Sequence, residues 1–210
     1  MIDLWLYERD YRAKGYTLIA GVDEAGRGPL AGPVFAAAVI LPYDHMIEGL
    51  NDSKKLSPQK RDRLYDMIVR EALTFSVTSS DHLTIDRINI LQASLLAMTH
   101  AVKHLAITPD LVLIDGNQKP LLPVSAECIV KGDAKSANIA AASILAKVSR
   151  DRFMEQMDLK YPQYHFAKHK GYPTKEHYDL LLKYGPCEIH RKSFLTKMDG
   201  LKWTENEREA

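Results

Sequence analysis

The sequence predicts an α/β fold in which a mixed sheet carries helices on its faces. Apolar, β-branched segments typical of buried strands occur early in the chain, and two long segments with an apolar residue at every third or fourth position follow. Glycine and proline separate many of these segments. The chain has 210 residues, of which 46% are hydrophobic and 26% charged, so it can form one substantial core.

The first part of the chain predicts a short amphipathic helix followed by three strands. Residues 1–16 alternate Leu and Tyr with charged side chains, which is typical of a helix outside the sheet. The three strands are apolar and β-branched, and we expect them at 17–22, 34–41 and 74–78.

A helix is predicted between the second and third strands. Ser57 is a suitable capping residue and Pro58 suits the first helical position. Its buried face is expected to contain Leu64, Met67 and Ile68.

The second half of the chain predicts alternating helices and strands. A long helix starts near residue 86, strands follow at 111–114 and 127–131, and a second long helix comes next. The apolar stripe of the first helix is Ile88, Leu91, Leu95, Met98, Val102 and Leu105, and that of the second is Ala137, Ala141, Ile144, Leu145 and Val148.

Four segments are expected along the chain. Beyond Phe153 the sequence is more polar, and a helix there is capped by Thr174 and stopped by Gly185 and Pro186. We expect an N-terminal helical segment at 1–16, a catalytic core at 17–157, a C-terminal helical substrate-binding lobe at 158–197 and a disordered tail at 198–210.

Composition and charge exclude several classes of protein. The net charge is +1, so a nucleic-acid surface would need local clusters of Lys and Arg. Cys128 and Cys187 have no metal-ligand spacing, which predicts a reduced, cytoplasmic protein without disulfides. Asp3 and Glu8 interrupt the N-terminus and argue against a signal peptide. The longest apolar run, 34–41, is far shorter than the ~20 residues that span a bilayer, so we expect no membrane association. Nothing in the composition demands more than a monomer.

Four acidic residues lie where predicted strands end. Asp23 and Glu24 follow the first strand, Asp115 follows the fourth, and Asp133 lies just past the fifth. Ligands gather beyond strand ends in α/β sheets, and carboxylates that converge there repel one another. A hard divalent cation, Mg²⁺ or Mn²⁺, would relieve that repulsion. A single Asp at a strand end is more often a cap, so the spacing alone leaves the four-residue cluster open.

Seven blocks of the sequence, in order, resemble bacterial ribonuclease HII. The first block reads GVDEAGRGPLAGPV, and the resemblance as a whole covers roughly residues 18–194. So many ordered matches identify the chain as a member of the type 2 ribonuclease H family. The blocks are 21–34, 51–56, 114–116, 131–133, 143–151, 169–174 and 190–194.

The resemblance implies a ribonuclease H-like fold with a five-stranded mixed sheet flanked by helices and a C-terminal helical lobe. It implies an endoribonuclease that hydrolyses the RNA strand of RNA–DNA hybrids and incises 5′ of single ribonucleotides in duplex DNA, within DNA replication and ribonucleotide excision repair. Its partners would be RNA–DNA hybrids and DNA that contains ribonucleotides. Family members often carry a longer N-terminal extension, so whether this N-terminus is full length stays open.

The resemblance also implies the catalytic residues. Asp23, Glu24, Asp115 and Asp133 match the family's four metal ligands, and the final Asp, in place of Glu, resembles type HII more than type HIII. In a mechanism with two Mg²⁺ or Mn²⁺ ions, Asp23 and Asp115 would be the main ligands and one of them would bridge the ions. Glu24 would complete one shell and Asp133 would hold the ion near the attacking water. In-line attack would leave a 3′-hydroxyl and a 5′-phosphate.

Gly26, Arg27 and Gly28 match the family's substrate reader. Glycine lets a backbone approach a sugar closely, and backbone groups can pair with the 2′-hydroxyl that distinguishes RNA from DNA. Tyr172 matches the family tyrosine that packs on the sugar next to the ribonucleotide.

Basic residues near these motifs are candidate phosphate contacts. They are Lys54, Lys55, Lys168 and Lys170, with Lys147 and Arg191 behind them. We interpret Asp151 as the partner of Arg150 or of another neighbour on its helix, and we expect His169 and His177 at the surface.

Two alternative functions stay open. One is another nuclease or a strand transferase of the same fold, which the Gly-Arg-Gly sequence and Tyr172 disfavour. The other is a catalytically silent protein that binds RNA–DNA hybrids, which the presence of all four carboxylates disfavours.

Overall fold

The computed structural model describes residues 3–50, 53 and 56–196. Within them a five-stranded sheet has the order β3-β2-β1-β4-β5. β1 pairs with β2, and β2 with β3, in antiparallel fashion, whereas β4 is parallel to both β1 and β5. The predicted five-stranded mixed sheet is therefore confirmed. The strands are β1 (Ile19–Ala25), β2 (Val34–Ile40), β3 (Thr74–Ser80), β4 (Leu111–Asp115) and β5 (Ser125–Ile129).

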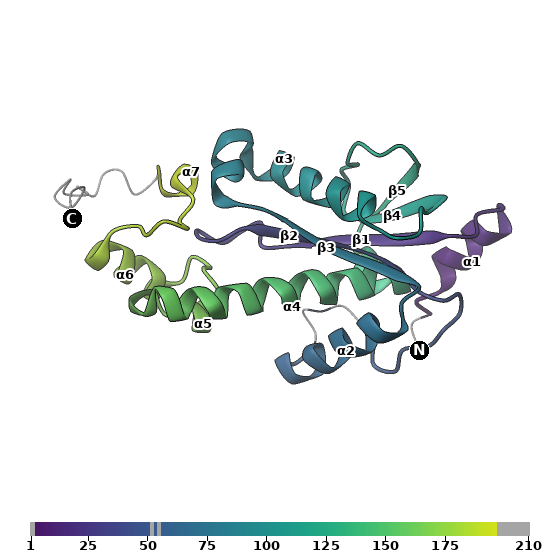
Figure 1. Ribbon diagram of the computed structural model, residues 1–210, viewed down its shortest axis with the longest axis horizontal. Helices are drawn as coiled ribbons and strands as arrows, with labels where there is room; N and C mark the ends of the chain where they lie inside the picture. The colour runs from purple at the N-terminus through teal and green to yellow at the C-terminus, as the bar shows by residue number, and fades with distance from the viewer. Residues whose placement is uncertain (1–2, 51–52, 54–55, 197–210) are drawn as a thin grey trace.

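Helices cover both faces of the sheet (Figure 1). α3 (His82–Lys103) lies on one face, and α4 (Ala137–Lys160) lies on the other with α2 (Pro58–Glu71) packed outside it. α1 (Leu6–Ala13) is at one end of the molecule. Short elements precede α4 or gather near its C-terminal end: η2 (Gly132–Ala134), η3 (Pro162–Tyr164), α5 (Phe166–His169), α6 (Lys175–Tyr184) and α7 (Lys192–Leu195).

Side chains cap the helices where the sequence predicts. The Ser57 hydroxyl oxygen accepts the Lys60 N–H at the start of α2, and Thr174 accepts the His177 N–H at the start of α6. α6 ends before Gly185, whose φ is 72°, a conformation that favours glycine.

Two predicted boundaries are wrong. β5 spans Ser125–Ile129, two residues earlier than expected, because the backbone turns left-handed at Lys131 with a φ of 58°. As an edge strand, β5 also exposes alternate residues and therefore has no continuous apolar run. α3 begins at His82, before residue 86, because the Asp81 carboxylate accepts the Thr84 N–H and caps a first helical turn. A kink at Asn89, whose φ is 66°, separates this part from the rest of α3, and the Asn89 side chain accepts the Gln92 N–H.

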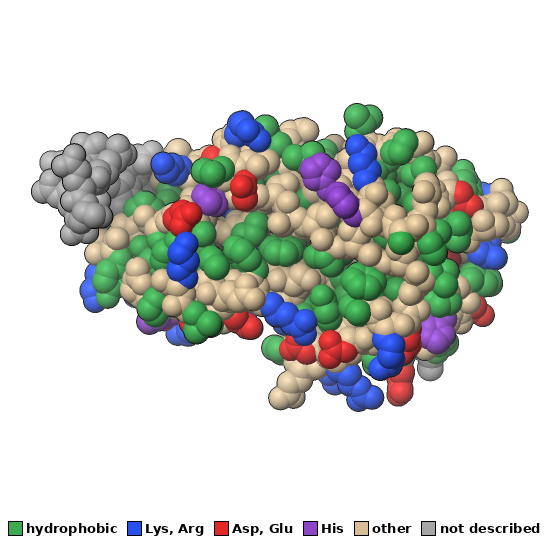
Figure 2. All heavy atoms as spheres, viewed as in Figure 1, with side chains coloured by type: hydrophobic (Ala, Val, Ile, Leu, Met, Phe, Trp, Pro, Cys, Tyr) green, Lys and Arg blue, Asp and Glu red, His purple; other side chains and the backbone are tan. Residues whose placement is uncertain are grey.

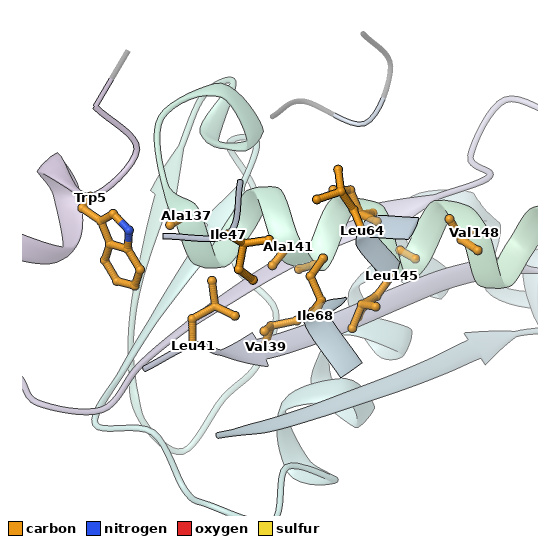
Figure 3. Close-up of a cluster of buried hydrophobic side chains, with 14 residues drawn as sticks. Trp5, Val39, Leu41, Ile47, Leu64, Ile68, Ala137, Ala141, Leu145 and Val148 are labelled. Atoms are coloured by element: carbon orange, nitrogen blue, oxygen red, sulfur yellow. The ribbon is translucent and has the colours of Figure 1, made fainter. Parts of the chain in front are cut away.

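The sheet has an apolar core on each face. On the α3 face, small residues of β1 and β2 let the helix pack closely: Ala20, Val22, Ala36 and Ala38 meet Ala97, Met98 and Ala101. On the α4 face, side chains of β2, α2 and α4 pack together (Figure 3). They include Val39, Leu41, Leu64, Ile68, Ala141, Leu145 and Val148.

α4 crosses β1 at Gly21 with no side chain between the two backbones. A Cβ at Gly21 would lie 2.1 Å from the carbonyl carbon of Asn138 and 2.2 Å from the nitrogen of Ile139. Only glycine permits this approach. The first turn of α4 is therefore held directly against the central strand.

The segment around α1 supplies hydrogen-bond acceptors to the start of α4. The Leu4 carbonyl accepts the Ala137 N–H at 2.8 Å. Glu8 Oε1 accepts the Ser136 hydroxyl at 2.6 Å and the Asn138 N–H at 3.2 Å. Burial raises the pKa of the Glu8 carboxyl. These contacts satisfy N–H groups that a helix start leaves without intrahelical partners.

The division into segments at 1–16, 17–157 and 158–197 stays a prediction, and 198–210 lies outside the described residues. Basic and acidic side chains are interspersed on the face in Figure 2. Among the described helices, none combines the length and the apolar character that crossing a membrane requires.

Ile68→Ala tests the packing of α2 against α4. Ile68 is fully buried, so its truncation should lower the free energy of unfolding by about 2–5 kcal/mol. The matched control is Val69→Ala on the same helix, where the side chain is 37% exposed and the change should stay within about 0.5 kcal/mol. Urea titrations followed by circular dichroism measure both. If both variants lose the same free energy of unfolding, the assignment of Ile68 to the buried face of α2 is wrong.

Candidate active site

Parallel pairing of β1 with β4 places Asp23 beside Asp115. Val22 pairs with Ile114, so the next residue of each strand is one of the two acids. Val22 and Ile114 pack on the α3 face, and side chains alternate along a strand, so both acids point to the α4 face.

Asp133 reaches the same place through η2, immediately before α4. The Gly132 N–H donates to Asp115 Oδ1 at 2.6 Å and ties the η2 segment to the end of β4. A Cβ at Gly132 would lie 2.6 Å from Ile139 Cδ1, so a larger residue there would have to displace the Ile139 side chain.

The structure brings three of the four predicted acids together. Asp23, Asp115 and Asp133 each offer one oxygen, and the three oxygens lie within 4.8 Å of one another. Burial, and then the charges of Glu24, Asp115 and Asp133, hold the pKa of Asp23 well above its ordinary value. Carboxylate oxygens crowded in this way fit a hard divalent cation, whose charge would offset their repulsion.

Glu24 lies on the other side of the sheet rim. As the neighbour of Asp23 in β1, it points toward α3, where it lines a hollow with Leu91 and Met98. Asp115, at the end of β4, also borders this hollow. Glu24 Oε1 is 3.4 Å from Arg27 Nη1. Glu24 is not part of the group of three oxygens, but it is near enough to raise the pKa of Asp23.

The predicted substrate loop and Tyr172 also meet. Gly26 has a φ of 101°, and a Cβ there would lie 2.1 Å from Arg150 Nε, so this position requires glycine. Arg27 and Gly28 are exposed. A Cβ at Gly28 would lie 3.7 Å from Tyr172 Cε1, so the half-exposed ring of Tyr172 lies beside Gly28.

The predicted phosphate contacts are only partly described. Lys54 and Lys55 lie outside the described residues. The three other lysines pair with acids at 2.6–2.7 Å: Lys170 with Glu155, Lys168 with Glu176, and Lys147 with Asp151. Their phosphate role stays a prediction, whereas the interpretation of Asp151 as the partner of a helix neighbour is confirmed.

The interpretation of Arg191 as a phosphate contact is wrong, because its side chain is fully buried. Nε donates to the Gly32 carbonyl at 2.8 Å, Nη1 to Arg27 at 3.0 Å and Nη2 to Gly26 at 2.6 Å. Burial, and then the charge of Arg150, lower the pKa of Arg191 to about 9. Arg191 belongs to the sequence block 190–194, which marks it as part of the family pattern but does not show that its side chain is buried.

Arg150 is a second buried arginine that the sequence did not reveal as part of the site. Its Nη2 donates to the carbonyls of Ala31 at 3.3 Å and Lys170 at 3.0 Å, and Nε donates to Pro33 at 3.3 Å. Arg150 therefore links the loop after β1 to the segment that carries Tyr172.

The expectation that His169 and His177 lie at the surface is also wrong. They are 8% and 0% exposed, and their rings stack at 4.4 Å. His177 Nδ1 lies 3.0 Å from the Tyr172 carbonyl, and its Nε2 lies 3.0 Å from His190 Nε2. Burial lowers the pKa of His177 to about 4. Burial, and then His177, lower the pKa of His190 to about 3.

Comparisons with known proteins agree on one family. The family profile described as ribonuclease HII matches residues 20–197. Ribonuclease HII of Caldicellulosiruptor saccharolyticus is 58% identical over 188 residues, which cover 90% of this chain and 92% of that protein.

Two solved structures share the fold. Ribonuclease H2 of Pyrococcus horikoshii has a TM-score of 0.72 at 28% identity, over 87% of this chain and 96% of that one. Bst ribonuclease HIII in complex with Mn²⁺ has a TM-score of 0.67 at 19% identity, and the match covers 88% of this chain and 69% of that one. The predicted ribonuclease H-like fold is confirmed by these similarities.

The buried histidines predict how stability depends on pH. Their pKa values are below the ~6.5 of an unfolded chain, which therefore binds more protons than the folded protein between pH 7 and pH 4. The contribution of these two histidines to stability should be fully present above about pH 7 and should be lost as pH falls, by roughly 2 kcal/mol for each ring at pH 5.

His190→Asn should reduce this loss by roughly 1–2 kcal/mol, because one titrating ring is removed while an acceptor for the Cys187 N–H is kept. Urea titrations at pH 7.5 and pH 5 measure the difference for both proteins. If the variant loses as much unfolding free energy between pH 7.5 and pH 5 as the parent does, His190 does not contribute to the pH dependence.

Proposed function

This chain belongs to the ribonuclease HII family and is a type 2 ribonuclease H enzyme, and from that premise we propose its substrates and mechanism. It hydrolyses the RNA strand of RNA–DNA hybrids and incises duplex DNA on the 5′ side of single ribonucleotides. The observation that carries the proposal is the convergence of Asp23, Asp115 and Asp133 near a loop suited to reading a sugar.

The proposed metal ligands are Asp23, Asp115 and Asp133, with Glu24 completing one shell. The crowding of three carboxylate oxygens and the raised pKa of Asp23 support this assignment, because a divalent cation offsets both. Two Mg²⁺ or Mn²⁺ ions bound there would supply Lewis-acid activation of water and stabilisation of the leaving oxygen. The Mn²⁺ complex of Bst ribonuclease HIII, which has the same fold, is consistent with this choice of ions.

The residues themselves provide a fixed arrangement of charge. The Gly132 N–H holds Asp115 Oδ1, and the Glu24 N–H donates to Asp23 Oδ1 at 2.7 Å. Asp133 lies on a segment anchored to both β4 and α4, where it orients the attacking water. In-line attack on phosphorus breaks its bond to the 3′ oxygen, which leaves a 3′-hydroxyl and a 5′-phosphate. Little reorganisation is then needed when the substrate arrives.

The Gly26–Gly28 loop recognises the ribonucleotide. Its exposed backbone next to Tyr172 suits contact with one sugar and stacking on the next. Such recognition needs only one 2′-hydroxyl, which accounts for incision at an isolated ribonucleotide. We infer a role in DNA replication and ribonucleotide excision repair in the cytoplasm, with Lys54 and Lys170 as phosphate contacts.

Asp115→Asn should abolish cleavage while the protein still binds its substrate. It removes a charge from the proposed metal site, so we expect a loss larger than the 10–100-fold that losing an outer-shell partner of a metal costs. The substrate is a labelled DNA duplex with one ribonucleotide, tested with Mg²⁺, Mn²⁺ or EDTA. The matched control is Asp10→Asn on the exposed surface of α1.

The outcomes separate the possible functions. A cut 5′ of the ribonucleotide that depends on the metal and on Asp115 supports the proposal. Cleavage of long hybrids alone would support the proposed nuclease activity but would exclude recognition of single ribonucleotides. Absence of cleavage by the parent protein with either ion would favour the silent binding protein.

Tyr172→Ala should affect one substrate more than the other. Loss of the ring removes packing at the ribonucleotide junction, so kcat/KM for the single-ribonucleotide duplex should fall about tenfold more than for a long hybrid, equivalent to about 1.4 kcal/mol. Steady-state kinetics on both substrates measure the ratio. Tyr43→Ala, at a similarly exposed tyrosine close to α1, is the control. An equal loss on both substrates would exclude junction recognition by Tyr172.

A further inference from the structure

We propose that Arg191 is a positioning residue that sets the preference for a 2′-hydroxyl. It does so by holding the carbonyls of Gly26 and Arg27 inward, which turns the following N–H groups toward the substrate. The inference rests on the proposed function, because it requires that this loop reads the sugar.

The guanidinium of Arg191 binds three backbone carbonyls of a single loop. All three nitrogens are used: Nη2 with Gly26, Nη1 with Arg27 and Nε with Gly32, at 2.6–3.0 Å. The planar, forked arrangement of donors in arginine permits this grip, whereas the single ammonium of lysine cannot reproduce it.

The orientation of the carbonyls determines where the N–H groups point. In a planar trans peptide the C=O of one residue and the N–H of the next point in opposite directions, and the described chain has no cis peptide. When the carbonyls of Gly26 and Arg27 face Arg191, the N–H groups of Arg27 and Gly28 face away from it. Both residues are exposed, and neither N–H has an acceptor within the described residues.

Two adjacent outward N–H groups form a site for an oxygen atom. A 2′-hydroxyl oxygen can accept from them, whereas a deoxyribose has no atom to do so. The Tyr172 ring beside Gly28 limits where the sugar can lie.

Arg150 and the segment 189–191 hold the other side of the loop. Arg150 binds the carbonyls of Ala31 and Lys170, and its guanidinium lies 5.6 Å from the centre of the Tyr172 ring. The Arg191 N–H donates to Leu30 at 2.8 Å, and the Leu30 N–H donates to Gly171 at 2.8 Å. The loop and Tyr172 are therefore held in one arrangement.

Arg191 cannot itself reach a phosphate, because none of its side chain is exposed. Within the described residues neither Arg191 nor Arg150 forms an ion pair, although Asp86 is near enough to raise the pKa of Arg191. Backbone carbonyls are thus the direct hydrogen-bond partners of both guanidiniums. Replacing the forked guanidinium of Arg191 should therefore disturb the loop that it holds.

The test is a comparison of binding by Arg191→Lys and its parent in the Asp115→Asn background, so that cleavage does not interfere. The probes are a DNA duplex with one ribonucleotide and the same duplex with deoxyribose throughout, with Mg²⁺ present. We expect the preference for the ribonucleotide to fall about tenfold, while affinity for the all-deoxy duplex changes less than twofold. Arg70→Lys, on the exposed surface of α2, makes the same chemical change and should leave the preference intact.

Three outcomes would overturn the inference. If Arg191→Lys lowers the affinity for both duplexes equally, and the affinity then depends less on salt, Arg191 is a phosphate contact. If the preference for the ribonucleotide survives Arg191→Lys, Arg191 does not set it, although the Gly26–Gly28 loop can still recognise the sugar. A parent protein without any preference would contradict the proposed reader, and this inference with it.

A second measurement does not depend on the folding of the variant. In the parent Asp115→Asn protein, backbone ¹H–¹⁵N spectra report the N–H groups of Arg27 and Gly28 directly. Both signals should shift further with the ribonucleotide duplex than with the all-deoxy duplex. Identical shifts with the two duplexes would show that these groups do not contact the hydroxyl and would overturn the inference.

Discussion

The contact between α4 and β1 at Gly21 is the constraint on which the acidic site depends. Without a side chain at that position, the first turn of the helix lies against the backbone of the central strand. The segment just before the helix then reaches the carboxyl ends of β1 and β4, where the Gly132 N–H binds Asp115. A larger residue at position 21 would push α4 away and separate Asp133 from the other two acids. The geometry of the acidic cluster thus follows from a packing contact that contains none of its acids.

Buried charges of opposite sign are compensated in different ways in this molecule. The carboxylates of Asp23, Asp115 and Asp133 crowd together, which raises the pKa of Asp23 and suits a cation. The guanidiniums of Arg150 and Arg191 are buried against the loop after β1 and bind backbone carbonyls directly. Several carbonyls hold each guanidinium, which fixes the loop after β1.

Local sequence signals predicted much of the fold, whereas the acidic cluster was assigned through the resemblance to the family, because spacing alone left it open. Apolar runs fixed the central strands, Ser57 and Thr174 marked helix starts, and acids after strands indicated the candidate metal ligands. Burial of Arg191 could not be predicted, since it arises from contacts with a segment far away in the chain. His177 is buried by ring contacts with His169 and His190, and no periodic pattern in the sequence marks those contacts. The Arg191 guanidinium, for example, binds residues more than 150 positions away. A polar side chain gives a single sequence no sign that distant carbonyls will surround it.

The strand order has a consequence for synthesis on the ribosome. β1 is the first strand to emerge and becomes the centre of the sheet, but β4, its second neighbour, is completed only at Asp115. The nascent β1-β2-β3 meander therefore presents an unpaired and highly apolar edge while more than thirty further residues are translated. Such an edge invites pairing with other chains. Before β4 arrives, α3 can cover one face of the meander and α2 can cover part of the other, but neither helix pairs with the free edge of β1.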